Sequence, residues 1–118
     1  MLGGPEVTTD VQLAYEMGTH ATRLTSEIET AAYRIVQEAV TNAVKHSRAR
    51  SVHVRVVDAG DELEVRVSDD GRGFNGVPGE DSFGIIGMRE RAALISGTLD
   101  VTSSAEGTCI TLTAPARR

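Results

Sequence analysis

The sequence predicts an α+β fold, a two-layer α/β sandwich in which helices cover one face of a mixed, mostly antiparallel sheet. Three observations carry this prediction. A long amphipathic helix pattern is followed by two alternating segments of hairpin spacing. A glycine-rich stretch without periodicity comes next, and a second helix pattern then precedes two more alternating segments.

The size and charge of the chain limit what it can be. Its 118 residues are the length of one domain, so we expect residues 1–118 to form a single domain with one core. With 40% hydrophobic and 25% charged residues the composition is that of a globular protein, which excludes a fibrous or disordered chain. The net charge of −5 argues against nucleic acid as a partner, because such surfaces neutralise phosphates with basic residues.

Cysteine content and hydropathy indicate the compartment. Cys109 is the only cysteine, which excludes an intrachain disulfide and is compatible with a reducing, cytoplasmic location. No apolar run approaches the roughly 20 residues that a membrane span requires, and the first residues carry no signal-peptide pattern. We therefore expect a cytoplasmic domain without direct membrane contact.

The N-terminal half of the chain predicts a strand and a helix. The strand pattern is short, with Val11, Leu13 and Tyr15 alternating with other side chains. A helix is expected over residues 26–46, with Ser26 as its cap and acidic residues in its first turn. Its apolar residues recur at helical spacing: Ala32, Ile35, Val36, Ala39, Val40 and Ala43.

A hairpin and a long loop follow. Ser51–Asp58 and Glu62–Asp69 alternate and are joined by three turn-forming residues, which predicts an antiparallel pair. Residues 70–82 contain four glycines and a proline and show no periodicity, so we expect a loop. Loops of this length inside compact domains are usually functional.

The last third of the chain predicts a helix and two strands. The helix is expected over Gly87–Ser96, with Gly97 placed to end it. Thr98–Ser103 and Thr108–Thr113 are expected to form two strands, closed by Pro115.

Polar residues on the long helix form one candidate site. Glu38, Asn42 and His46 lie at i, i+4 and i+8, so they follow one flank of the helix, at the border of its apolar stripe. The spacing alone is more typical of a solvated helix flank.

Glycine-rich segments form a second candidate region. Asp69 and Asp70 lead directly into Gly71 and Gly73, and glycines there allow the backbone to turn sharply and approach a flat or anionic ligand. A plain Asp-Gly turn is the alternative. The helix that opens near Gly84 and Gly87 offers unpaired N–H groups to phosphates.

Together these residues resemble the ATPase domain shared by histidine kinases, gyrase, Hsp90 and MutL. Four stretches are similar to sensor histidine kinases whose partner regulators are of the NarL type: YRIVQEAVTNAVKHS, VSDDGRGF, GIIGMRERA and EGTCITLTAP. The resemblance covers about residues 24–115, which would be the core of the domain. It implies an ATP-binding catalytic domain that uses Mg²⁺.

The resemblance implies roles for residues of the long helix. Asn42 corresponds to a residue that contacts Mg²⁺ between the phosphates, and Glu38 to one that orients a magnesium-bound water or assists proton removal. Lys45 would meet a phosphate oxygen and His46 would flank the nucleotide. An exposed lysine and a satisfied helix-end histidine are the alternatives.

The resemblance also implies an adenine pocket. Asp69 matches the residue that accepts a hydrogen bond from the adenine amino group, which would select ATP over GTP. Gly71 and Gly73 would let the chain pass beside the base, and residues 74–83 would form a lid. Thr108 matches a threonine that supports adenine through Asp69 and water.

At the phosphates, Gly84 and Gly87 correspond to the glycines beneath the phosphate groups. Two positions depart from the subgroup. Ser82 stands where a further glycine is usual, and Ile85 where leucine is usual, which leaves lid motion and phosphate affinity open.

The resemblance implies partners as well. None of the three histidines, His20, His46 and His53, is a credible phosphoacceptor, so we expect a piece of a larger kinase that is monomeric alone. It would donate the γ-phosphate to a histidine on a separate dimerisation segment, and so indirectly to a response regulator. An anti-sigma-factor-type serine kinase and an ATP-binding regulatory module are the alternatives with the same fold.

Overall fold

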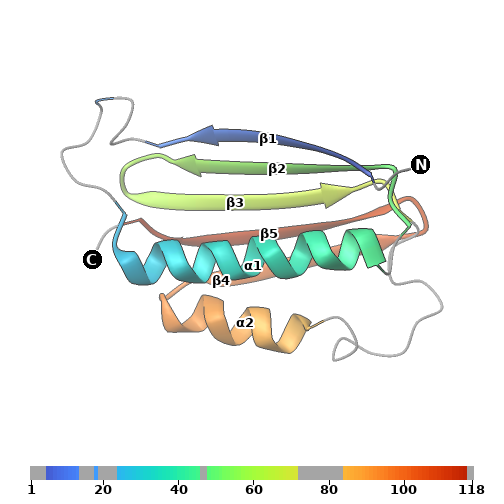
Figure 1. Cartoon of the computed structure of the whole chain (residues 1–118). Helices are drawn as coiled ribbons and strands as arrows, with labels where there is room; N and C mark the ends of the chain where they lie inside the picture. The colour runs from blue at the N-terminus through green and yellow to red at the C-terminus, as the bar shows by residue number, and fades with distance from the viewer. Residues whose placement is uncertain (1–4, 14–17, 19–23, 46–47, 72–83, 117–118) are drawn as a thin grey trace.

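The computed structural model describes residues 5–13, 18, 24–45, 48–71 and 84–116. Five strands form one sheet in the order β1-β2-β3-β5-β4, and two helices cover one of its faces (Figure 1). Among the described strands, only β1 and β2 pair in parallel. This arrangement confirms the predicted two-layer α+β sandwich with a mixed, mostly antiparallel sheet. The elements are β1 (Glu6–Gln12), α1 (Ser26–Lys45), β2 (Ser51–Asp58), β3 (Glu62–Asp69), α2 (Ile85–Leu94), β4 (Thr98–Ser104) and β5 (Gly107–Pro115).

The first strand lies earlier than the alternating pattern predicted. β1 ends at Gln12, so Leu13 follows the strand, and Tyr15 lies outside the described residues. The position of β1 is set by its parallel ladder with β2, which runs from Glu6 opposite Ser51 to Gln12 opposite Val57. The backbone N–H of Glu6 also donates to the carbonyl oxygen of Arg50 at 2.9 Å. Pairing with a distant segment, and not local alternation, therefore defines this strand.

The long helix is confirmed, with one correction at its start. Thr25, and not Ser26, caps α1, because the Thr25 Oγ1 accepts a hydrogen bond from the Ile28 N–H at 3.3 Å. The Ser26 hydroxyl donates instead to the neighbouring Glu27 carboxylate at 3.3 Å. The described helix ends at Lys45. Its buried face faces the sheet and consists of Ile28, Ala31, Ile35, Ala39, Asn42 and Ala43.

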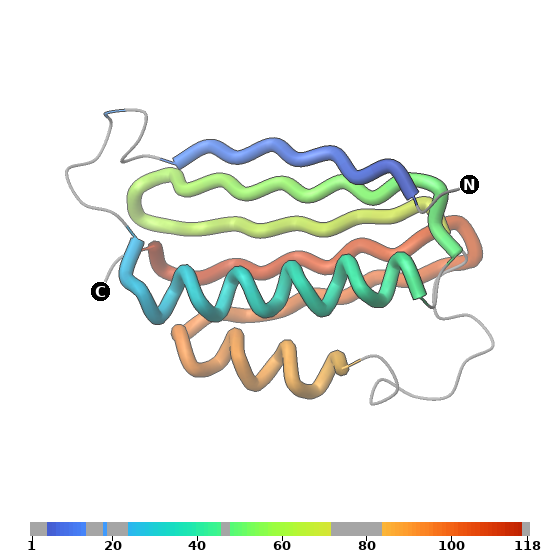
Figure 2. The backbone as a smooth tube through the Cα atoms, viewed as in Figure 1, coloured from blue at the N-terminus to red at the C-terminus, as the bar shows by residue number. Residues whose placement is uncertain are grey.

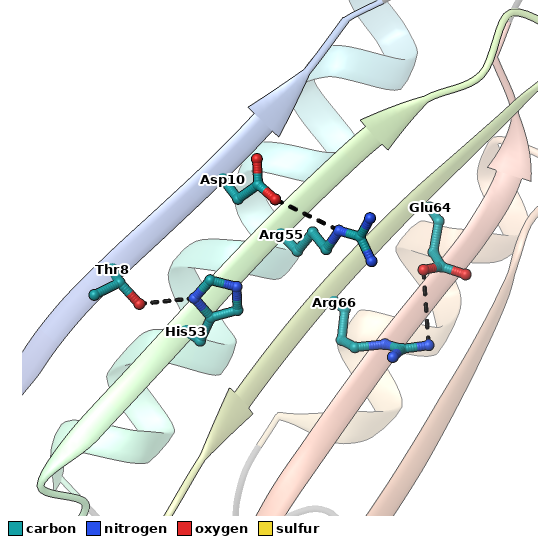
Figure 3. Close-up of polar contacts among 6 residues, drawn as sticks. All are labelled: Thr8, Asp10, His53, Arg55, Glu64 and Arg66. Atoms are coloured by element: carbon teal, nitrogen blue, oxygen red, sulfur yellow. Dashed lines mark hydrogen bonds and ion pairs between the residues drawn. The ribbon is translucent and has the colours of Figure 1, made fainter.

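The two faces of the sheet differ in character. Towards the helices, β2 and β3 bury Val52, Val54, Leu63, Val65 and Val67, and β5 buries Ile110 and Leu112 in the same core. Figure 3 shows the polar side chains of the opposite face, where the Thr8 hydroxyl bonds His53 Nδ1 at 2.7 Å and Arg55 lies 3.6 Å from Asp10. Such half-exposed ion pairs contribute little to stability, so the helix-covered face holds the fold together.

The second helix begins two residues before the predicted start. Ile85 is the first residue of α2, and its side chain is fully buried in the core. The helix ends at Leu94, before the predicted end at Ser96, and the left-handed residue that ends it is Ser96, with a φ of 59°, and not Gly97. The Gly97 N–H donates to the Ala92 carbonyl oxygen at 2.8 Å.

The last two strands are longer than predicted. β5 runs to Pro115, because it is an inner strand that pairs with β3 from Glu62 opposite Pro115 to Asp69 opposite Thr108. Its register therefore places the start of β5 beside the end of β3.

Each helix and strand has one of its two ends at the same end of the sandwich, where the candidate site residues lie (Figure 2). There, β3, β4 and α1 finish, and β1, β2, β5 and α2 begin. Of the two helices in the described part of the chain, neither has the length and hydropathy needed to cross a membrane.

Candidate functional site

Asp69 is the last residue of β3 and forms the centre of the first half of the site. Its Oδ1 accepts a hydrogen bond from the Gly71 N–H at 2.8 Å, which fixes the carboxylate as the chain leaves the strand. Burial raises the pKa of Asp69, and the charge of Asp70 raises it further, while the N–H groups of Gly71 and Thr108 act in the opposite direction. Asp69 is thus a hydrogen-bond acceptor that is fixed by the Gly71 N–H and partly buried from solvent.

Thr108 lies directly opposite Asp69 in the β3–β5 ladder. Its side chain is buried, and its Oγ1 lies 3.2 Å from the Ser103 hydroxyl on β4. Asp69 and Thr108 share a pocket of about 280 Å³ with residues of the β4–β5 hairpin. The structure therefore brings these two predicted residues together.

Gly107 contributes to this half of the site and was missed by the sequence reasoning. It has a φ of 153°, and a Cβ built there would overlap the backbone carbonyl oxygen of Asp69. A glycine directly after a two-residue hairpin turn is a known signature of such close approaches, and this pattern could have indicated it. Gly107 allows β5 to lie against the chain at Asp69.

The second half of the site lies between α1 and the start of α2. Gly84 caps α2 with a φ of 68°, and a Cβ added there would lie 3.0 Å from the Cδ of Glu38. Glu38, Gly84, Gly87 and Arg91 line a pocket of about 330 Å³ with neighbouring residues of both helices. Three predicted residues, Glu38, Gly84 and Gly87, are therefore adjacent at a helix N-terminus.

The remaining predicted residues have different surroundings. Asn42 lies one turn beyond Glu38 and is only 3% exposed, whereas Lys45 is exposed in the last turn of α1. Neither lines the two pockets described above. His46 and Gly73 lie outside the described residues, as do 74–83, the predicted lid.

The described residues fit a magnesium nucleotide in chemical terms. A partly buried carboxylate, Asp69, suits an amine-bearing base, and the helix start at Gly84 suits an anionic tail because its N–H groups lack intrahelical partners. The space beside Gly84 is one that a Cβ would fill. Glu38 and Asn42 carry the oxygen ligands that Mg²⁺ prefers.

Comparison with known proteins places these features in context. Residues 27–118 match the family described as histidine kinase-, DNA gyrase B- and HSP90-like ATPase. The histidine kinase domain from the blue-light activated histidine kinase of Erythrobacter litoralis is similar, with a TM-score of 0.73 and 26% sequence identity. That match covers 98% of this chain and 53% of the other, so the chain spans about half of that structure.

Two further structures are similar. The longer structure of the same Erythrobacter litoralis kinase has a TM-score of 0.68 at 28% identity, with 97% of this chain and 36% of that chain covered. The mycobacterial sensor histidine kinase MprB has a TM-score of 0.67 at 20% identity, with 95% and 82% covered. The likeness to MprB shows a shared fold.

Proposed function

The chain belongs to the histidine kinase-, DNA gyrase B- and HSP90-like ATPase family, and on this premise we propose that it is the ATP-binding catalytic domain of a sensor histidine kinase. In this proposal the domain binds Mg·ATP and donates the γ-phosphate to a histidine on a separate segment, for relay to a response regulator of the NarL type. The observation that carries the proposal is the position of Asp69 at the same end of the sandwich as the glycine cap of α2.

The adenine base is proposed to bind at Asp69. One carboxylate oxygen accepts from the Gly71 N–H, and in this proposal the carboxylate also accepts from the adenine amino group. Guanine carries a carbonyl oxygen at that position, and two acceptors facing each other repel. Asp69 would thus select ATP over GTP, with Thr108 as its neighbour across the ladder.

The phosphates are proposed to lie over the start of α2. The N–H groups there and the positive end of the helix dipole favour an anion, and Gly84 and Gly87 leave the approach open. Asn42 would hold Mg²⁺, which supplies charge neutralisation when bound. Lys45, exposed at the end of α1, would contact a phosphate oxygen, and Glu38 would hold a water or a proton beside the phosphates.

The phosphoacceptor is proposed to lie outside these 118 residues. The Erythrobacter litoralis histidine kinase domain is about twice as long as the part that this chain matches, which leaves room in a kinase of that size for an acceptor helix. His53, the one histidine whose surroundings the structure describes, stands on the open sheet face with its Nδ1 bonded to Thr8. We propose that the isolated domain is cytoplasmic and monomeric.

A phosphotransfer assay tests this function. The chain is incubated with γ-labelled Mg·ATP and with the acceptor-bearing helical segment of its parent kinase, and the product is treated with acid. We expect the segment to carry labelled phosphate, and we expect acid to remove this label, because phosphohistidine is acid-labile. An acid-stable product would favour the serine kinase alternative, and the absence of transfer despite ATP binding would favour the regulatory module.

Replacing Gly87 with alanine separates stability from binding. Gly87 is the third residue of α2, and among the described residues no atom would lie within 4 Å of a Cβ added there, so the gain in helix propensity should stabilise the fold by about 0.5–1 kcal/mol. A methyl group beneath the phosphates should weaken binding of an ATP analogue about tenfold. Urea unfolding and calorimetric titration measure the two effects. Unchanged affinity in the more stable variant would remove Gly87 from the phosphate site.

A further inference from the structure

Asp70 is an exposed residue whose carboxylate has an unusual number of partners. Its Oδ1 accepts hydrogen bonds from the backbone N–H groups of Arg50 at 2.8 Å and of Ser51 at 2.9 Å. Its Oδ2 accepts from the Ser51 hydroxyl at 3.1 Å, and the Asp70 N–H donates to the Ser51 carbonyl oxygen at 3.3 Å. Four hydrogen bonds therefore join the residue after β3 to the residues that lead into β2.

These bonds favour the charged carboxylate. The N–H groups of Ser51 and Arg50 lower the pKa of Asp70, and the Ser51 hydroxyl adds to the effect. Hydrogen bonds to a charged acceptor are stronger than those between neutral groups. The contact is therefore held at neutral pH although the side chain is exposed to solvent.

The segment that Asp70 holds is also tied to two other elements. The Ala49 N–H donates to the carbonyl oxygen of Ala43 in the last turns of α1, at 3.4 Å. The Arg50 carbonyl oxygen accepts from Glu6 at the start of β1. One carboxylate thus links the end of α1, which carries Asn42 and Lys45, to the end of β3, which carries Asp69.

We propose that Asp70 is a positioning residue for nucleotide binding. By holding residues 49–51 against the end of β3, Asp70 fixes the position of Asp69 relative to the last turn of α1. The base and the phosphates of one nucleotide can then contact the two parts of the site at the same time. The inference rests on the proposed function. Asp70 itself makes no contact with the nucleotide in this proposal, since both of its oxygens already have partners within the chain.

Two substitutions of Asp70 both remove its charge and differ in whether an acceptor oxygen remains. Asp70→Ala removes both acceptors, whereas Asp70→Asn makes the same change in net charge and retains the Oδ1 that accepts from Arg50 and Ser51. Ser51→Ala removes only the hydroxyl contact. Asp100→Ala, an exposed carboxylate on β4, is the control for the loss of an acidic side chain.

The test combines calorimetric titration of non-hydrolysable ATP and GTP analogues with the amide proton shifts of Arg50 and Ser51. We expect Asp70→Ala to weaken ATP binding roughly tenfold, to reduce the ATP/GTP preference and to move both amide shifts upfield. Asp70→Asn should recover most of the affinity, Ser51→Ala should lose about twofold to threefold, and Asp100→Ala should match the unaltered chain.

The outcomes separate this inference from the proposed function. If the unaltered chain binds ATP and Asp70→Ala binds it equally well and with equal preference, the positioning role is wrong and the proposed function stands. Loss of affinity in Asp70→Asn equal to that in Asp70→Ala would also overturn it, since charge alone would then be responsible. If the unaltered chain binds no nucleotide, the proposed function fails and this inference fails with it.

Discussion

Replacing Asp69 with asparagine is expected to weaken ATP binding by about 100-fold and to leave the fold intact. The asparagine Oδ1 can still accept from the Gly71 N–H, which now lies 2.8 Å from the carboxylate. The second oxygen becomes an NH₂ group, so that two donors would face each other where adenine presents its amino group. A site built for one hydrogen-bond pattern rejects the wrong pattern strongly. Calorimetric titration with and without Mg²⁺ measures the loss.

The same variant should be no less stable than the unaltered chain at neutral pH. Burial raises the pKa of Asp69 in the folded state, so its contribution to stability is fully present below its unfolded pKa of about 3.9 and is lost as the pH rises through the folded value. Asparagine cannot ionise and avoids this loss. Unfolding curves should therefore give the variant a larger free energy of unfolding than the unaltered chain at pH 7. Near pH 3 this advantage should be gone. A less stable variant at pH 7 would mean that the hydrogen bonds to the charged form outweigh burial.

Replacing Gly107 with alanine is expected to destabilise the fold by about 2–4 kcal/mol and to abolish nucleotide binding. The new methyl group would overlap the carbonyl oxygen of Asp69, a backbone atom that cannot turn aside as a side chain could. The backbone of Gly107 also has a φ of 153°, which side chains disfavour. The end of β3 and the start of β5 must therefore separate at the site.

Chemical unfolding and titration of an ATP analogue measure both effects of this change. Gly87→Ala is the matched control, because it adds the same methyl group where no atom of the described part of the chain lies within 4 Å. We expect opposite signs for the two changes in the free energy of unfolding. A Gly107→Ala variant within about 0.5 kcal/mol of the unaltered chain would show that the β4–β5 turn moves without cost.

The sequence predicted the elements whose evidence is local. The β2–β3 hairpin has the predicted bounds, because alternation and a turn-forming connection lie within one stretch of chain. β1 was misplaced because its ladder is with β2, a segment far along the chain. The extension of β5 to Pro115 likewise depends on pairing with β3.

The candidate site also contains residues that local sequence features indicate and residues that act through contacts with distant segments. Residue types and glycine spacing pointed to Asp69, Glu38 and Gly84, since these are chemical features of the chain itself. Gly107 was not singled out and Asp70 was given no role of its own, because both act through contacts across strands: the overlap at the Asp69 carbonyl and the bonds to Arg50 and Ser51. The role of each nucleotide contact stays a prediction until binding is measured.

The parallel pairing of β1 and β2 gives the domain a direction-dependent response to mechanical force. A pull along the axis of β1 would load the whole ladder from Glu6 to Gln12 in shear, whereas a sideways pull on its start would peel the pairs one after another. Peeling begins at the bond between the Glu6 N–H and the Arg50 carbonyl oxygen. A sideways pull on the start of β1 would therefore reach the peptide groups of residues 50 and 51 before the rest of the ladder.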